Sequence, residues 1–222
     1  MSEAAIDAAI AAMPLPSGPS VVETGCGRGE ILVRTVQAHR PAHGLGVDLD
    51  ADAIAEARDR AADPPVRFEV LDAGAVEGRF DAVINVASSH AHGGFPRVLD
   101  ALRAFAPVAL YGEGFWRHPP SYDFLNALGG ARADELEHLD GLRAATGNAG
   151  FEIVHESLAS EEDWQRYEET LATNAERHGT EETLAYAQQI RDRRALPDGA
   201  NTLGFALFVL RLKRRGPLEG VS

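Results

Sequence analysis

A short glycine-rich segment between a strand-like run and a helix-like run constrains this chain most. Residues 25–29 read G-C-G-R-G. Residues 20–24 before them are strand-like, and residues 30–40 after them carry apolar side chains at helical spacing. Glycines in such a turn let the backbone bend sharply and approach a ligand closely. The N-terminus of the following helix is electropositive and favours an anionic group. The segment therefore predicts a ligand-binding strand–turn–helix unit.

The alternation of strand-like and helix-like runs continues through the first two-thirds of the chain. Strands are expected at residues 20–24, 44–49, 66–71, 79–86 and 107–111. This rhythm indicates parallel strands joined by helical crossovers, which form a doubly wound α/β sheet. Two more strands, at residues 151–158 and 202–212, lie on either side of a polar helical segment. We therefore expect a seven-stranded, Rossmann-like sheet, mostly parallel, with an antiparallel last strand.

We expect residues 1–222 to form a single domain with a helical cap, residues 160–200, inserted before the last strand. Apolar side chains recur there at helical spacing, which predicts two amphipathic helices with a thin apolar stripe: Trp164, Tyr167 and Leu171, then Leu184, Ala187 and Ile190. The many acidic side chains of this segment, Glu168 among them, are expected to be solvated. The helices could form a lid over an active site; a dimerisation element and surface decoration are the alternatives. Residues 133–149 are also predicted to be helical.

Net charge and cysteine content limit the kinds of partner and metal site that this chain can have. Lysine and arginine number 21 and aspartate and glutamate 34, so the formal net charge is −13. Such a surface repels a phosphate backbone and disfavours nucleic acid. No apolar stretch reaches the roughly 20 residues of a membrane span, and no basic leader opens the chain. The single cysteine, Cys26, excludes an internal disulfide and a cysteine-rich zinc site. We expect a cytoplasmic protein with a small-molecule partner and no metal.

The tight G-x-G-x-G spacing resembles the first motif of class I S-adenosylmethionine-dependent methyltransferases. A dinucleotide-binding G-x-G-x-x-G would place its third glycine at position 30, which is Glu30, so a nicotinamide-dependent oxidoreductase is the poorer match. The resemblance implies S-adenosylmethionine as the cofactor. It implies a cofactor loop that contains Gly25, Cys26, Gly27 and Gly29, with Glu23 near the amino-acid end of the cofactor.

Residues 46–50, which read G-V-D-L-D, resemble the second motif of that family. The resemblance implies that Asp48, at the end of the second strand, receives both ribose hydroxyls. A carboxylate suits this role because it accepts two hydrogen bonds at once. Leu49 is expected to contact the cofactor beside it. The alternative is that Asp48 or Asp50 caps the next helix.

Two later segments resemble the third and fourth motifs of the same family, in the expected order. Residues 66–72 end in Asp72, which the resemblance places against the adenine amino group, with Ala73 beside it. Asp72 could otherwise be a solvated loop carboxylate. Residues 80–85 resemble the segment that runs under the methionine end of the cofactor. Asn85 is therefore expected to lie near the methionine moiety.

The substrate should sit where the fourth and fifth strands end, because ligands of open α/β sheets bind beyond the carboxyl ends of the strands. Two segments lie there, residues 85–94 and 112–122. His90 could act as a base, orient the substrate, or bond only to local backbone. Glu113 is a second candidate for catalysis. The aromatic candidates for a pocket wall are Trp116 and Tyr122, although Trp116 could instead pack under the cap.

The resemblance implies direct, in-line methyl transfer. The methyl group of a sulfonium is already electrophilic, so an enzyme has mainly to align the acceptor and exclude water. The stretch G-E-G-F-W at residues 112–116 resembles a bacterial branch of small-molecule methyltransferases. We therefore expect a methyltransferase acting on a small molecule. A protein of the same fold that binds S-adenosylmethionine or S-adenosylhomocysteine without turnover is the alternative.

Overall fold

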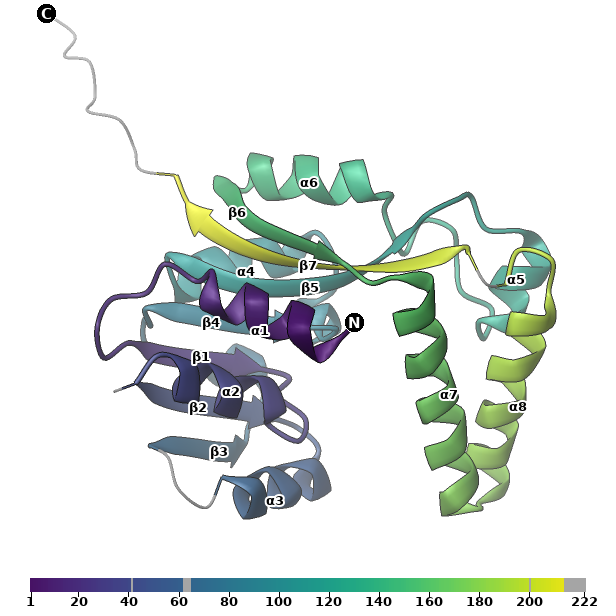
Figure 1. Cartoon of the computed structure of the whole chain (residues 1–222), viewed down its shortest axis with the longest axis horizontal. Coiled ribbons are helices and arrows are strands. Elements are labelled where there is room, and N and C mark those ends of the chain that lie inside the picture. The colour runs from purple at the N-terminus through teal and green to yellow at the C-terminus, as the bar shows by residue number, and fades with distance from the viewer. Residues whose placement is uncertain (41, 62–64, 200, 214–222) are drawn as a thin grey trace, which may run out of the picture.

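The computed structural model describes residues 1–40, 42–61, 65–199 and 201–213, and a seven-stranded sheet lies at its centre (Figure 1). Its strands are β1 (Ser20–Thr24), β2 (His43–Asp48), β3 (Val66–Val70), β4 (Ala82–Val86), β5 (Val108–Trp116), β6 (Phe151–Leu158) and β7 (Leu203–Leu212). Their order is β3-β2-β1-β4-β5-β7-β6. β1 to β5 are parallel, and β7 is antiparallel to both β5 and β6. The doubly wound sheet and its antiparallel last strand are confirmed.

The strand order reverses at β1, which has β2 on one side and β4 on the other. The helix after β1 lies on one face of the sheet and the helix after β4 on the opposite face. A crevice opens at such a reversal, outside the carboxyl ends of the strands, and this is the usual ligand site of an open α/β sheet. The glycine segment follows β1 and therefore lies at this crevice.

Helices cover both faces of the sheet and enclose two apolar cores. On one face lie α1 (Glu3–Ala11), α2 (Glu30–Ala38) and α3 (Ala51–Arg60); on the other lie α4 (Arg97–Phe105) and α6 (Leu139–Asn148). Leu32 and Ile54 are fully buried in the first core, and Leu102 and Leu142 in the second. Because the central strands are covered on both sides, their sequences read as near-continuous apolar runs.

The cap is a helical hairpin that stands on the side where β1 to β5 end (Figure 1). It consists of α7 (Glu161–His178) and α8 (Glu181–Ala195), inserted between β6 and β7. Each helix begins with a capping box, at Ser160 and at Thr180, which satisfies backbone N–H groups of its first turn. Gly179 ends α7 in the left-handed conformation, φ 67°. The two helices match the sequence expectation, while residue 200 of the predicted cap lies outside the described residues.

A buried ion pair joins the two cap helices. Glu168 of α7 is 2% exposed and accepts from Arg193 of α8 at 2.6 Å, with Arg194 3.7 Å from its other oxygen. The expectation that Glu168 is solvated was therefore wrong. Its helical position faces α8, where Ala172, Ala175, Ala187 and Ile190 form a small apolar cluster. The carboxylate is buried by that packing and is neutralised across it.

One arginine connects the two ends of the cap insertion to the sheet. Arg117 follows β5, and its side chain donates to the carbonyl oxygen of Leu203 (3.2 Å), at the start of β7, and to that of Ala159 (2.6 Å), just after β6. Its backbone N–H donates to Thr202 (2.8 Å). The residues where the chain leaves and re-enters the sheet are thus held by the same side chain.

Two predicted boundaries differ from the structure by five residues or more. β5 continues to Trp116, five residues beyond the expected end at position 111, because β7 pairs with it over its whole length despite two glycines. The predicted helix over residues 133–149 begins only at Leu139. The chain before it instead runs beside the end of β5, where the Trp116 N–H donates to Glu137 (2.9 Å) and the His138 ring bonds to the Trp116 carbonyl (2.8 Å).

Candidate functional site

The glycine segment forms a tight turn pinned to the end of β2. Gly25, Gly27 and Gly29 have φ values of 67°, 50° and 72°, a region that L-residues avoid. The N–H groups of Gly25 and Cys26 both donate to the Val47 carbonyl, at 2.9 and 3.0 Å. The turn therefore depends on glycine for its backbone conformation and on β2 for its position.

The three glycines differ in what surrounds them. A Cβ on Gly25 would lie 2.4 Å from the Cβ of Ser88, and one on Gly29 would lie 2.4 Å from the Phe68 ring. A Cβ on Gly27 would meet nothing within 4 Å. Gly25 and Gly29 thus allow the loop to pack closely against other side chains of the same chain, whereas Gly27 leaves open space above the loop. That space is suited to a ligand that approaches the backbone.

Asp48 holds the loop while keeping acceptor capacity. It ends β2, and its Oδ2 accepts from the Gly27 N–H (2.8 Å) and its Oδ1 from the Asp50 N–H (3.0 Å). Each carboxylate oxygen has a second lone pair. The predicted alternative role is filled by Asp50, which is the N-cap of α3 and accepts from Asp52 and Ala53. Asp48 is therefore free of helix capping.

Glu23 lies beneath the loop in β1, almost completely buried. Its Oε2 accepts from the Leu32 N–H of α2 at 3.1 Å. Burial raises the pKa of this carboxyl to about 8; the Leu32 bond opposes the shift and the charge of Asp48 adds to it. Cys26 also lies in the apolar core, and burial raises the pKa of its thiol. The thiol is therefore a poor nucleophile.

A cavity of about 340 Å³ opens at the carboxyl ends of β2, β3 and β4. Its walls include six residues predicted for the site: Gly25, Asp48, Leu49, Asp72, Ala73 and His90. The other wall residues lie within the predicted segments 46–50, 66–72 and 85–94 but were not singled out there; they are Val47, Leu71, Val86, Ala87, Ser88 and Ala91. They flank the predicted strand ends, and that position was the available signal. The cavity thus joins the first three predicted motifs in one place.

Asp72 begins a short 3-10 helix, η1 (Ala73–Ala75), at one wall of the cavity. Its Oδ1 accepts from the Gly74 N–H at 2.7 Å, and Ala73 is buried behind it. The opposite wall comes from η2 (Ser89–His92), which carries the exposed His90. Ala87, between β4 and η2, has φ 56°. This left-handed residue turns the chain abruptly and places η2 across the cavity from η1.

Behind the cavity, Asn85 organises a buried polar network. Its Nδ2 lies near three acceptors, the carbonyl and hydroxyl oxygens of Thr24 (3.3 and 3.0 Å) and the carbonyl of Ser88 (3.2 Å). The Ser88 hydroxyl donates to the Thr24 carbonyl (2.9 Å), and His92 Nε2 bonds to the Thr24 hydroxyl (3.1 Å). Burial lowers the pKa of His92. Asn85 Oδ1 is buried and has no hydrogen-bond partner among the residues that the structure describes, which leaves one acceptor for a ligand.

On the predicted substrate side, Glu113 is buried in β5. Its Oε2 accepts from the Tyr111 hydroxyl (2.9 Å) and its Oε1 from the Gly114 N–H (3.1 Å). Tyr111 is fully buried, and burial and then the charge of Glu113 raise the pKa of its phenol. Tyr111 therefore remains a proton donor to Glu113.

The two predicted aromatic wall residues lie away from the cavity. Trp116 is 2% exposed, packs edge-on against Phe124 at 6.2 Å between ring centroids, and donates its indole N–H to Ala133 (2.9 Å). It packs under the cap, as in the alternative interpretation, because β5 extends to it and buries it. Tyr122 is 82% exposed at the start of α5 (Tyr122–Ala127). The structure therefore does not bring Trp116, Tyr122 and His90 together.

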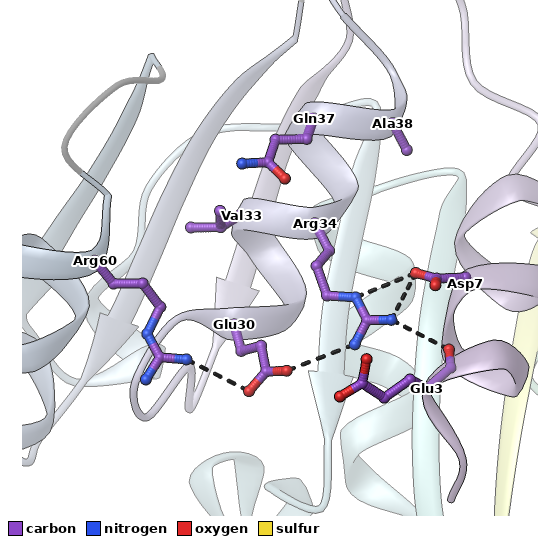
Figure 2. A pocket seen from close by; sticks show the side chains of 8 residues that line it. All are labelled: Glu3, Asp7, Glu30, Val33, Arg34, Gln37, Ala38 and Arg60. Atoms are coloured by element: carbon purple, nitrogen blue, oxygen red, sulfur yellow. Dashed lines mark hydrogen bonds and ion pairs between the residues drawn. The ribbon is translucent and has the colours of Figure 1, made fainter.

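A larger groove, of about 610 Å³, lies between α1, α2 and α3 (Figure 2). Arg34 is at its centre and donates to Asp7 at 2.6 Å and, at 3.1 Å, to the Glu3 carbonyl. Glu30 lies 3.5 Å from both Arg34 and Arg60. The charged side chains of this groove pair with one another and join α1 to α2. We therefore take the cavity at the strand ends as the candidate site.

Among the residues that the structure describes, no three or more His, Cys, Asp or Glu side chains are grouped so that they could hold a metal ion. No helix of the described chain combines the length and the apolar character needed to cross a membrane.

Comparisons with known proteins point to one kind of domain. Residues 21–109 match the protein family described as a methyltransferase domain. A curated relative, the uncharacterised protein YjhP of Escherichia coli, is 29% identical over 161 residues. That match covers 68% of this chain and 64% of the relative, so the chain spans slightly less than two-thirds of the relative's length.

Two solved structures agree over almost the whole chain. A methyltransferase from Geobacter sulfurreducens, dependent on S-adenosylmethionine and complexed with S-adenosylhomocysteine, has a TM-score of 0.84 at 26% identity. A corresponding complex from Thiobacillus denitrificans has a TM-score of 0.82, also at 26% identity. Each comparison covers 96% of this chain and 92% of the other. The similarity therefore includes the cap as well as the sheet.

Proposed function

Because the chain belongs to the class I S-adenosylmethionine-dependent methyltransferase family, we propose that it transfers a methyl group from S-adenosylmethionine to a small-molecule acceptor. The observation that carries this proposal is the cavity at the strand ends, where the glycine loop, Asp48 and Asp72 meet. Two similar structures hold S-adenosylhomocysteine, the product that S-adenosylmethionine becomes when it loses its methyl group.

The residues of the cavity fit the adenosine part of this cofactor. We assign the ribose hydroxyls to Asp48, whose two oxygens each accept one backbone N–H and retain a lone pair for a further donor. We assign the adenine amino group to Asp72, which has one carboxylate oxygen outside its bond to Gly74. Leu49 and Ala73 supply apolar contact at the same walls.

The loop and the network behind it fit the amino-acid end. Asn85 Oδ1 is a buried acceptor without a partner among the described residues, which suits an ammonium donor. The open space above Gly27 admits the chain of the ligand close to the backbone. The buried carboxyl of Glu23 lies beneath the loop and would stabilise positive charge when ionised. In this assignment the thiol of Cys26 stays in the core and only the backbone of that residue contributes to the loop.

The chemistry requires little of the protein beyond alignment. S-adenosylmethionine supplies an electrophilic methyl group, so the chain has to orient the acceptor and exclude water. His90 lies exposed at the cavity wall, where it could orient the acceptor or take its proton. The cap stands on the same side of the sheet and is suited to limit the access of water (Figure 1). The net charge of −13 favours a small molecule over nucleic acid as acceptor.

Calorimetric titration tests the cofactor first. The purified chain is titrated with S-adenosylmethionine, S-adenosylhomocysteine, NAD⁺ and NADP⁺. We expect micromolar binding of the first two alone. Binding of a nicotinamide cofactor would contradict the proposal. A chain that binds both adenosyl compounds but releases no S-adenosylhomocysteine with any acceptor would instead be a non-catalytic binding protein.

A further inference from the structure

Glu113 is a buried carboxylate whose charge is not balanced by its contacts. It is 7% exposed, and in the described part of the chain its oxygens accept only from neutral donors, the Tyr111 hydroxyl and the Gly114 N–H. Buried charges in proteins are normally paired with an opposite charge or a metal. Glu168 and Arg193 in the cap show the paired arrangement within this same molecule. Glu113 therefore lacks the cation that its burial calls for.

Tyr111 cannot supply that balance, because it donates one proton and carries no positive charge. Burial, and then the charge of Glu113, raise the pKa of the phenol and keep it protonated. The Tyr111 bond fixes the position of one Glu113 oxygen and leaves lone pairs on both oxygens. The carboxylate is thus held in place with acceptor capacity remaining.

Glu113 is not among the residues that line the cavity, but its strand passes the end of β4, which contributes to that cavity. β4 ends at Val86, opposite Gly112, and the segment that contains Glu137 joins the same edge only at Trp116. Residues 113–115 therefore have no strand beside them on that edge. The gap lies directly beyond the carboxyl end of β4, which is where an acceptor should approach the cofactor.

Asn85 Oδ1, which has no hydrogen-bond partner in the described part of the chain, lies on the same face of the sheet. Asn85 is the register partner of Tyr111 on the neighbouring parallel strand, and Glu113 is two residues along from Tyr111. Side chains at these positions point to one face of the sheet. Asn85 is bonded to Thr24, next to the glycine loop, so we assign it to the amino-acid end of the cofactor. Glu113 lies farther from the loop, on the acceptor side.

We propose that Glu113 binds the protonated amino group of the methyl acceptor, so that the substrate class is an amine. This inference rests on the proposed methyl transfer. The ammonium donates to the Glu113 carboxylate and passes one proton to it, which frees the nitrogen lone pair. The nitrogen then forms a bond to the methyl carbon, the carbon–sulfur bond breaks, and its electron pair stays on sulfur. The products are an N-methylammonium, a neutral thioether and one proton released from Glu113 to solvent.

The test compares the wild-type chain with Glu113→Gln and with Glu77→Gln, the same change at an exposed carboxylate. Each is given S-adenosylmethionine labelled in its methyl group and a panel of primary amines with their hydroxyl and carboxylate analogues of equal shape. We expect labelled product only from amines, retained on a cation exchanger at neutral pH. We expect kcat/KM to fall at least tenfold in Glu113→Gln, as for loss of a charged hydrogen bond, and to be unchanged in Glu77→Gln.

Binding measurements separate this role from a structural one. S-adenosylhomocysteine affinity should be the same in Glu113→Gln as in the wild type. Glutamine keeps the shape and one acceptor oxygen for Tyr111, but its NH2 group then faces the Gly114 N–H, so the midpoint of thermal unfolding should fall while cofactor affinity does not. The methylated amine, titrated into the chain loaded with S-adenosylhomocysteine, should bind at least tenfold more weakly to the variant.

Three results would overturn the inference. Label found in hydroxyl or carboxylate acceptors would exclude amine specificity, and full activity of Glu113→Gln on an amine would remove the role of Glu113. Failure of the wild-type chain to label any acceptor, with cofactor binding intact, would overturn the proposed methyl transfer itself.

Discussion

The cofactor end of the sheet and the helical cap are held in position by different kinds of contact. At the cofactor end, backbone groups set the geometry: the N–H groups of Gly25 and Cys26 meet the Val47 carbonyl, and Asp48 accepts from Gly27. In the cap, side chains do so, through the buried Glu168–Arg193 pair and through Arg117 at the two ends of the insertion. Substitutions at the cofactor end and substitutions in the cap should therefore change different properties of the protein.

The largest effect is expected in the cap. Glu168→Gln removes the negative partner of a buried pair and leaves Arg193 uncompensated, which should lower the free energy of unfolding of the α7–α8 hairpin by about 3–5 kcal/mol. Hydrogen exchange of the hairpin amides measures it. Glu176→Gln, also in α7 but in an exposed pair with Arg191 of α8, should leave the protection of the hairpin almost unchanged. Equal protection of the hairpin in both variants would contradict the comparison.

At the cofactor end, substitutions of two glycines should distinguish an effect on folding stability from an effect on cofactor binding. Gly29→Ala adds a Cβ 2.4 Å from the Phe68 ring at φ 72°, so crowding and backbone strain should together lower the free energy of unfolding by about 3 kcal/mol. Urea unfolding followed by circular dichroism measures it. Gly27→Ala meets no atom within 4 Å and should cost only the backbone strain, about 1–2 kcal/mol. It should nevertheless weaken S-adenosylhomocysteine binding, and an unchanged affinity would contradict the assignment of that space.

A third pair of variants tests Asp48 against its neighbour. Asp48→Ala should weaken S-adenosylmethionine binding by about 1–3 kcal/mol, through loss of charged hydrogen bonds to the ribose. Asp50→Ala removes the N-cap of α3 and should lower the free energy of unfolding by about 1 kcal/mol with little change in affinity. Calorimetry and urea unfolding on both variants distinguish the two effects. Identical affinities in the two variants would contradict the assignment of the ribose hydroxyls to Asp48.

A different kind of effect, a dependence of stability on pH, is expected at the cofactor end. Burial raises the pKa of Glu23 in the folded chain to about 8 from its ordinary value of 4.5, so between these values the unfolded chain loses this proton while the folded chain keeps it. The stability contributed by Glu23 is therefore fully present below pH 4.5 and is lost as the pH rises to about 8, by up to about 1.4 kcal/mol per pH unit. Glu23→Gln should flatten the dependence of urea unfolding on pH over this window. An unchanged slope would show that Glu23 is ionised in the folded chain.

The two regions also differ in how far the sequence predicts them. The turn at Gly25 to Gly29 and the strand ends at Asp48 and Asp72 follow local rules, because glycine conformation and strand period are properties of a few consecutive residues. The burial of Glu168 depends on which side of α7 packs against α8. The acidic residues that flank Glu168 in the sequence do not indicate that packing. Trp116 was misplaced for a similar reason, since only pairing with the distant β7 carries β5 through two glycines.

The hairpin leaves from one strand and returns to its neighbour. The Ala159 N–H bonds to Phe205 at 2.9 Å, so the last residue before the hairpin lies beside the third residue of the returning strand. A short hairpin loop could join β6 to β7 across this distance without altering any register of the sheet. The segment is thus an exchangeable module, whose length and sequence can change while the pairing of all seven strands is kept.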